Sequence, residues 1–134
     1  MESPRDTVIA KIKDRSANVV VIGLGYVGLP LAVVSARAGF VVTGIERNPE
    51  RVADVNRGKS YIEGVEHEEL EPLIVGERLR ATVDFSRIAS ADVVIICVPT
   101  PLNRHKDPDT DHIKDVLDRA DSYWHSGQLI ILES

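Results

Sequence analysis

The chain has 134 residues, of which 43% are hydrophobic and 28% charged, and its formal net charge is -5. This is the size and composition of one globular domain. Its negative charge and scattered basic residues argue against binding to nucleic acid or an anionic membrane, and no apolar run is long enough for a membrane helix.

Cysteine usage and the N-terminus narrow the possibilities further. Cys97 is the single cysteine, which excludes an internal disulfide and a multi-cysteine metal site. The first residues lack the apolar stretch of a secretory signal. We therefore expect a cytoplasmic protein without a metal site and without nucleic-acid or membrane partners.

The first elements are a short helix and a buried strand. Val8, Ile9 and Ile12 have helical spacing, which predicts an amphipathic helix over 6–15 within a leading segment, 1–17. The apolar, β-branched run over 18–22 is typical of a strand buried on both faces of a parallel sheet.

Helices and strands then alternate to the end of the chain. Further helices are predicted at 26–38, 49–57, 66–75 and 111–125, with a helical turn at 86–90. Further strands are predicted at 40–45, 79–82, 92–98 and 128–132, and the segment over 58–65 is an irregular connection.

This alternation indicates βαβ units with right-handed crossovers. The predicted fold is α/β, an open, doubly wound parallel sheet of the Rossmann type that occupies residues 18–134 as a single domain. The sequence stops directly after a strand of buried type, so we expect a truncated piece of a longer protein.

A glycine motif lies between the first strand and the first helix of the sheet. Residues 23–28 read Gly-Leu-Gly-Tyr-Val-Gly, which matches G-x-G-x-x-G in the context that dinucleotide binding requires. Gly23 permits the tight turn, Gly25 permits a diphosphate to approach the backbone, and Gly28 permits the helix to pack closely on the strand. The N–H groups at the helix start favour the negative diphosphate.

An acidic residue follows the second strand, about 20 residues beyond the glycines. Glu46 is placed to accept hydrogen bonds from an adenosine ribose, and its charge opposes a 2′-phosphate. The sequence thus predicts a preference for NAD over NADP. The neighbouring Arg47 argues the other way, since an arginine can accommodate that phosphate, and a solvated surface role for Glu46 is the alternative interpretation.

The opposite wall of the predicted crevice comes from later strands, because ligands bind outside the carboxyl ends of the strands. The strand over 92–98 ends in Val98; Pro99 and Thr100 follow it, and Glu133 follows the last strand. A rigid loop without a ligand is the alternative for this wall. Cys97 is expected to be an inert thiol inside a buried strand. The histidines at 67, 105, 112 and 125 are expected on the surface.

Three blocks of the sequence, in order, resemble the UDP-glucose/GDP-mannose dehydrogenase family. They are the runs over 21–32, 58–62 and 97–102. The Gly-Tyr-Val-Gly-Leu-Pro of the first block and the Val-Pro-Thr-Pro of the third are far more specific than the general glycine fingerprint. The leading helix, the Ser-Tyr-Ile at 60–62 and the Asp-Pro-Asp at 107–109 are nearest to the bacterial UDP-N-acetylglucosamine 6-dehydrogenase branch.

The resemblance implies an enzyme of polysaccharide biosynthesis that oxidises the C6 alcohol of a UDP-hexose to the carboxylate with two NAD, through a thioester on a cysteine. It implies cofactor contacts for the diphosphate from Gly25, Tyr26 and Val27, for the ribose from Glu46 and Arg51, and for the rest of the cofactor from Thr100, Glu133 and Ser134.

The catalytic groups and the UDP-sugar domain of that family lie outside this sequence, and Cys97 does not match the nucleophile. We therefore expect this chain to bind NAD and to contain no catalytic residue. The whole protein is expected to be a homo-oligomer that takes its UDP-sugar through the missing domains. The alternatives are the NAD-binding domain of another dehydrogenase, of the 3-hydroxyacid or hydroxyacyl type, and a non-enzymatic nucleotide-sensing module.

Overall fold

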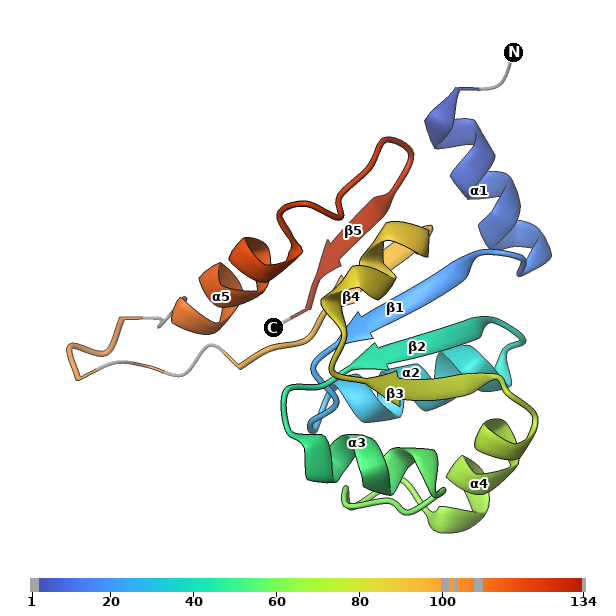
Figure 1. Cartoon of the computed structure of the whole chain (residues 1–134), viewed down its shortest axis with the longest axis vertical. Coiled ribbons are helices and arrows are strands. Elements are labelled where there is room, and N and C mark those ends of the chain that lie inside the picture. The colour runs from blue at the N-terminus through green and yellow to red at the C-terminus, as the bar shows by residue number, and fades with distance from the viewer. Residues whose placement is uncertain (1–2, 100–101, 103, 108–109, 134) are drawn as a thin grey trace.

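The computed structural model describes residues 3–99, 102, 104–107 and 110–133. They form a five-stranded sheet in the order β3-β2-β1-β4-β5, and every neighbouring pair is parallel (Figure 1). The strands are β1 (Asn18–Ile22), β2 (Val41–Ile45), β3 (Leu79–Thr82), β4 (Val93–Ile96) and β5 (Leu129–Leu132). The predicted open, doubly wound parallel sheet is confirmed.

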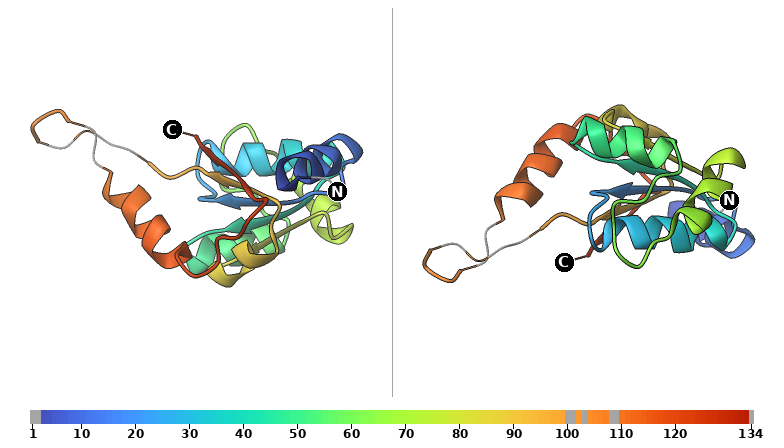
Figure 2. Two further views of the ribbon diagram at one scale, coloured as in Figure 1. Left: turned by 90° about the horizontal axis from the view of Figure 1, so that it is seen from above. Right: turned by 90° about the horizontal axis from the view of Figure 1, so that it is seen from below.

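Helices cover both faces of this sheet. They are α1 (Pro4–Asp14), α2 (Gly28–Arg37), α3 (Pro49–Asn56), α4 (His67–Val75), the 3-10 helix η1 (Phe85–Ser90) and α5 (Asp111–Ala120). Figure 2 shows α2 and α5 on opposite sides of the sheet, with α1 on the side of α2. None of the described helices combines the length and apolar character needed to cross a membrane.

Local sequence explains where the early helices begin. At α1, the side chain of Ser3 accepts a hydrogen bond from the N–H of Asp6, and a proline occupies the first turn. The same arrangement recurs at α3, where Asn48 caps the N–H of Glu50 ahead of Pro49. These are strong helix-start signals, because they satisfy backbone donors that have no partner within the helix.

The core consists of two apolar layers, one on each face. Val19 and Val21 of β1 point into the layer that α1, α2 and α4 cover, whereas Val20 and Ile22 point into the layer that η1 and α5 cover. Successive residues of a strand alternate between faces. A strand covered on both faces is therefore apolar at successive positions, which explains the uninterrupted runs in β1 and β4.

The last strand has the apolar pattern of a buried strand and no covering helix in this sequence, and the residues of β5 are 38–55% exposed. One prediction near the C-terminus is wrong. The last helix was expected to reach residue 125, but α5 ends at Ala120. The N–H of Tyr123 bonds the carbonyl of Ala120 at 2.8 Å in a turn, so Tyr123 and Trp124 pack against the second core layer.

An asparagine protects the outer edge of β3. The Asn56 Nδ2 donates to the Ala81 carbonyl at 2.9 Å, and its Oδ1 accepts from the Ala81 N–H at 2.8 Å. The amide thus occupies the position of a further strand. This contact ties α3 to the sheet and pairs backbone groups that an edge strand otherwise leaves open.

We expect Asn56→Ala to lower the free energy of unfolding by about 1–3 kcal/mol, because it leaves both backbone groups of Ala81 without this partner. Urea denaturation followed by circular dichroism measures the change. Asn56→Asp is a second variant: it keeps the acceptor for the Ala81 N–H but sets a carboxylate oxygen against the Ala81 carbonyl, so it should also lower the free energy of unfolding. An unchanged midpoint for Asn56→Ala would contradict this role.

Candidate functional site

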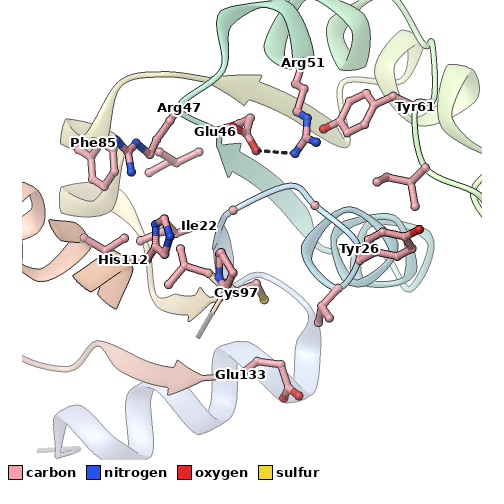
Figure 3. Close-up of a pocket in the computed structure, with 18 of the residues that line it drawn as sticks. Ile22, Tyr26, Glu46, Arg47, Arg51, Tyr61, Phe85, Cys97, His112 and Glu133 are labelled. Atoms are coloured by element: carbon pink, nitrogen blue, oxygen red, sulfur yellow. Dashed lines mark ion pairs between the residues drawn. The ribbon is translucent and has the colours of Figure 1, made fainter. Parts of the chain in front are cut away.

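The sheet has its switch point between β1 and β4, which are neighbours in space but distant in sequence. Ligands of such sheets bind in the crevice beyond the carboxyl ends of these strands. A cleft of about 560 Å³ lies there (Figure 3). The predicted site residues that line it are Gly23, Gly25, Tyr26, Val27, Glu46, Arg47, Arg51, Val98, Pro99 and Glu133.

The turn after β1 gives each glycine a different role. Gly23 has φ +94°, and a Cβ added there would lie 2.3 Å from the Cys97 carbonyl oxygen. A Cβ added at Gly28 would lie 1.6 Å from the Gly23 oxygen, so Gly28 packs behind the turn and does not line the cleft. At Gly25 the nearest atom would be the Arg51 Nη1, at 3.9 Å. Gly25 therefore presents an open stretch of backbone to the cleft.

Helix α2 begins directly after this stretch. Its N-cap residue, Val27, makes no side-chain hydrogen bond to the first turn. Within its first turn the Leu29 N–H donates to the Gly25 carbonyl at 3.1 Å and Pro30 has no N–H, so the attraction for an anion comes from the helix dipole and the backbone of the preceding turn. The open backbone at Gly25 and the uncapped start of α2 are thus suited to a diphosphate.

Glu46 lies at the end of β2 and is only 9% exposed. Its Oε1 accepts from the Leu24 N–H at 3.2 Å, and its Oε2 accepts from the Asn48 N–H at 2.8 Å. The alternative of a solvated surface charge is therefore wrong. A carboxylate has about four acceptor positions, so each oxygen keeps capacity for a ligand hydroxyl.

Two arginines flank this carboxylate. Arg51 Nη1 lies 3.8 Å from the Glu46 Oε1, and its guanidinium stacks over the Tyr61 ring at 5.0 Å. Arg47 lies on the other side, with its Nη1 3.5 Å from the Asp115 Oδ2. Both arginines are paired with carboxylates.

The second wall follows β4 and β5. Val98, Pro99 and Glu133 line it, while Thr100, which was expected to face the cofactor, lies outside the described residues. Cys97 does not lie inside the strand as expected. Strand β4 ends at Ile96, and Cys97, the next residue, is half-buried and lines the cleft.

Burial raises the pKa of the Cys97 thiol to about 11, and the Glu133 carboxylate adds to the shift. At pH 8.5 about half of an ordinary cysteine is thiolate. We expect Cys97 to react with iodoacetamide roughly a hundredfold more slowly than a cysteine peptide at that pH, since only the thiolate attacks. Alkylation followed by mass spectrometry measures the rate. Glu133→Gln should speed the reaction, and a rate equal to that of the peptide would contradict the assignment.

Several cleft residues were not predicted as site residues. They are Ile22, Ile45, Tyr61, Ile62, Glu63, Phe85, Cys97, His112 and Val116. Tyr61 and Ile62 belong to the block over 58–62 that resembles the family, so a signal for them existed. Phe85 and His112 carried none. His112 was expected on the surface, but α5 brings it to the cleft, whereas the other three histidines are exposed.

The sequence profile described as "UDP-glucose/GDP-mannose dehydrogenase family, NAD binding domain" matches residues 17–134. This chain belongs to that family. It forms the NAD-binding domain, and among its described residues no group of His, Cys, Asp and Glu is arranged to hold a metal ion.

Named relatives agree with this assignment. The UDP-N-acetyl-D-mannosamine dehydrogenase of Pyrococcus horikoshii is 32% identical over 118 residues, which are 87% of this chain and 28% of that protein. The UDP-N-acetyl-D-glucosamine 6-dehydrogenase of Pseudomonas aeruginosa is 32% identical over 120 residues, which are 90% of this chain and 28% of that protein. This NAD-binding domain thus spans less than a third of these relatives.

A solved structure shows the same fold. The NDP-N-acetyl-D-galactosaminuronic acid dehydrogenase of Methanosarcina mazei superposes with a TM-score of 0.82 at 31% identity, covering 100% of this chain and 30% of that one. The family match supports the nucleotide-sugar dehydrogenase assignment over the 3-hydroxyacid or hydroxyacyl dehydrogenases and over a non-enzymatic sensing module.

Proposed function

We propose that the whole protein is an NAD-dependent UDP-sugar 6-dehydrogenase that oxidises the C6 alcohol of a UDP-hexose to the uronate with two NAD. UDP-N-acetylglucosamine, UDP-N-acetylmannosamine and UDP-glucose are the candidate substrates. The family match over residues 17–134 carries the class of substrate, and the glycine turn with the buried Glu46 beside it, both in one cleft, carries the binding of NAD.

The cleft supports one orientation of NAD. The diphosphate would lie over Gly25 at the start of α2, and the adenosine ribose would bond Glu46. The adenine would extend toward Phe85 and His112, which lie beside Arg47 in Figure 3.

The nicotinamide would extend the opposite way, toward the wall of Val98, Pro99 and Glu133. Tyr26, which is 81% exposed, and Val27 would border the diphosphate. Thr100 keeps its predicted role facing the cofactor.

The electrostatics favour NAD over NADP. Glu46 places a negative charge where a 2′-phosphate would lie, and both nearby arginines are already paired with carboxylates. NAD supplies the hydride acceptor, while this domain orients it and holds it away from water. The thiol of Cys97 stays protonated because its pKa is raised, which fits a domain whose nucleophile lies elsewhere in the protein.

The proposal is tested in two steps. Calorimetry with this chain should show binding of NAD that is stronger than binding of NADP. The full-length protein, supplied with NAD and each candidate UDP-sugar, should then produce NADH with two equivalents per sugar. Absence of turnover with every UDP-hexose would overturn the substrate class, and absence of NAD binding would overturn the site.

We further propose that this chain alone is inactive, and that the full-length protein is a cytoplasmic homo-oligomer. Mixing the purified chain with NAD and UDP-sugars should yield no NADH. Light scattering of the full-length protein measures its oligomeric state.

A further inference from the structure

The peptide of Leu24, in the centre of the glycine turn, is held by side chains from two distant segments. Its N–H donates to the Glu46 Oε1 at 3.2 Å, and its carbonyl accepts from the Tyr61 hydroxyl at 2.7 Å. The Leu24 side chain is fully buried. Side chains therefore hold both the N–H and the carbonyl of Leu24, which fixes the turn that faces the cleft.

Tyr61 also touches the arginine above this turn. The Arg51 guanidinium lies 5.0 Å from the Tyr61 ring centroid, 3.8 Å from Glu46 and 3.9 Å from the point that a Cβ at Gly25 would occupy. Figure 3 shows Arg51 between Glu46 and the Tyr61 ring. Leu24, Glu46, Arg51 and Tyr61 therefore form a closed ring of contacts around the open backbone.

We propose that Tyr61 is a positioning residue for the dinucleotide: its hydroxyl fixes the glycine turn through Leu24, and its ring holds Arg51 over the turn, facing both Glu46 and the bound diphosphate. This inference rests on the proposed function. Arg51 has a flexible side chain that is 44% exposed, and a guanidinium stacked on an aromatic face loses less freedom when a ligand binds.

The hydroxyl is suited to this task. Burial raises the pKa of Tyr61, and the Glu46 carboxylate adds to the shift while Arg51 opposes it. The phenol therefore stays protonated and continues to donate to the Leu24 carbonyl. Tyr61 lies in the irregular connection between α3 and α4, so this hydrogen bond also anchors that segment to the site.

The experiment measures the NAD affinity of the whole chain by calorimetry for two variants. Tyr61→Phe removes only the hydroxyl and should weaken NAD about 3- to 10-fold. Tyr61→Leu also removes the ring and should weaken NAD binding by about a further 2- to 5-fold. Tyr123→Phe is the matched control, since Tyr123 packs in the other core layer, and it should bind NAD like the unaltered chain.

A double-mutant cycle separates positioning from a merely structural role. In an Arg51→Gln background, the added effect of Tyr61→Leu relative to Tyr61→Phe should disappear, because the ring then has no guanidinium to hold. The proton resonances of the Arg51 side chain should also lose their ring-current shift in Tyr61→Leu without any ligand present.

The outcomes are distinguishable. If the unaltered chain binds no NAD, the proposed function fails. If it binds NAD and both Tyr61 variants match it, or if the ring effect is equal in both Arg51 backgrounds, the positioning role of Tyr61 is wrong. Should Tyr61→Leu not fold, Tyr61→Phe and the control still decide the role of the hydroxyl.

Discussion

Gly28→Ala is expected to destabilise the domain by at least about 3 kcal/mol, and Gly25→Ala is expected to leave its stability nearly unchanged and weaken NAD at least about tenfold. The two glycines belong to the same motif. They differ in what an added methyl group meets.

At Gly28 the methyl group would lie 1.6 Å from the Gly23 carbonyl oxygen and 3.3 Å from the Cys97 Cβ. Both contacts are with the turn and with the residue after β4, which cannot move without displacing the sheet. Relief therefore requires α2 to shift away from β1 and expose part of the first core layer. Such a shift removes a large part of a typical domain's stability.

At Gly25 the methyl group would meet only the Arg51 Nη1, at 3.9 Å, and the backbone φ lies outside the left-handed region. Alanine is thus compatible with the free domain. Its methyl group would occupy the space where the diphosphate would approach the backbone. The loss should therefore appear in binding and not in folding.

Urea denaturation and calorimetry with NAD, applied to both variants, measure the two effects. Each variant serves as the control for the other, because the chemical change is identical. If the Gly25→Ala chain binds NAD normally, the diphosphate does not bind at this turn. A Gly28→Ala chain with unchanged stability would contradict the packing argument.

Glu46→Gln is expected to weaken NAD by about 10- to 100-fold and to narrow the gap between NAD and NADP. The carboxylate oxygens would accept hydrogen bonds from the ribose, and a hydrogen bond to a charged group contributes about 1.5–3 kcal/mol. Removing the charge also removes repulsion of a 2′-phosphate, and it frees Arg51, now 3.8 Å from Glu46, to approach that phosphate.

Glutamine is preferred to alanine at this position because its amide oxygen still accepts from one of the two backbone N–H groups that Glu46 bonds, although its amide nitrogen cannot accept from the other. Glu46 accepts from the backbone N–H groups of Leu24 and Asn48. Glu46→Ala leaves both donors without this partner and should also lower stability, by about 1–3 kcal/mol. Calorimetry with NAD and NADP measures the preference, and the melting temperature reports on folding. NAD affinity that is equal in the unaltered chain and in Glu46→Gln would refute the ribose contact.

The local sequence determined most helices and strands, and it placed the glycine turn and Glu46 in the site. Strand β1, its turn and the start of α2 are contiguous, so the tight turn at Gly23 and the close packing at Gly28 could be predicted from spacing alone. Glu46 could be predicted for a similar reason, since it ends the strand that pairs with β1. The alternation of strands and helices predicts a parallel sheet, and the single hand of the crossovers sets the face on which each helix lies, whereas the strand order came from the structure.

Tertiary structure alone decided the rest. Phe85 and His112 reach the cleft from a 3-10 helix and the start of α5, and no period or spacing links them, whereas Tyr61 stands in a block that resembles the family and only its contacts needed the structure. The ion pairs of Arg47 and Arg51, likewise, depend on how helices pack. Hydrophobic patterns record which residues are buried, whereas contacts between distant segments depend on where the sheet order places them.

The same distinction explains the wrong end of the last predicted helix. Helix α5 has an amphipathic pattern that continues past Ala120, and the packing of Tyr123 and Trp124 ends it early. The sequence by itself determined the fold class and the glycine turn, because the pattern of each strand and helix and the spacing of the glycines lie in short contiguous segments. The arrangement of charges and rings around that turn was decided by the packing of segments that only the folded chain brings together.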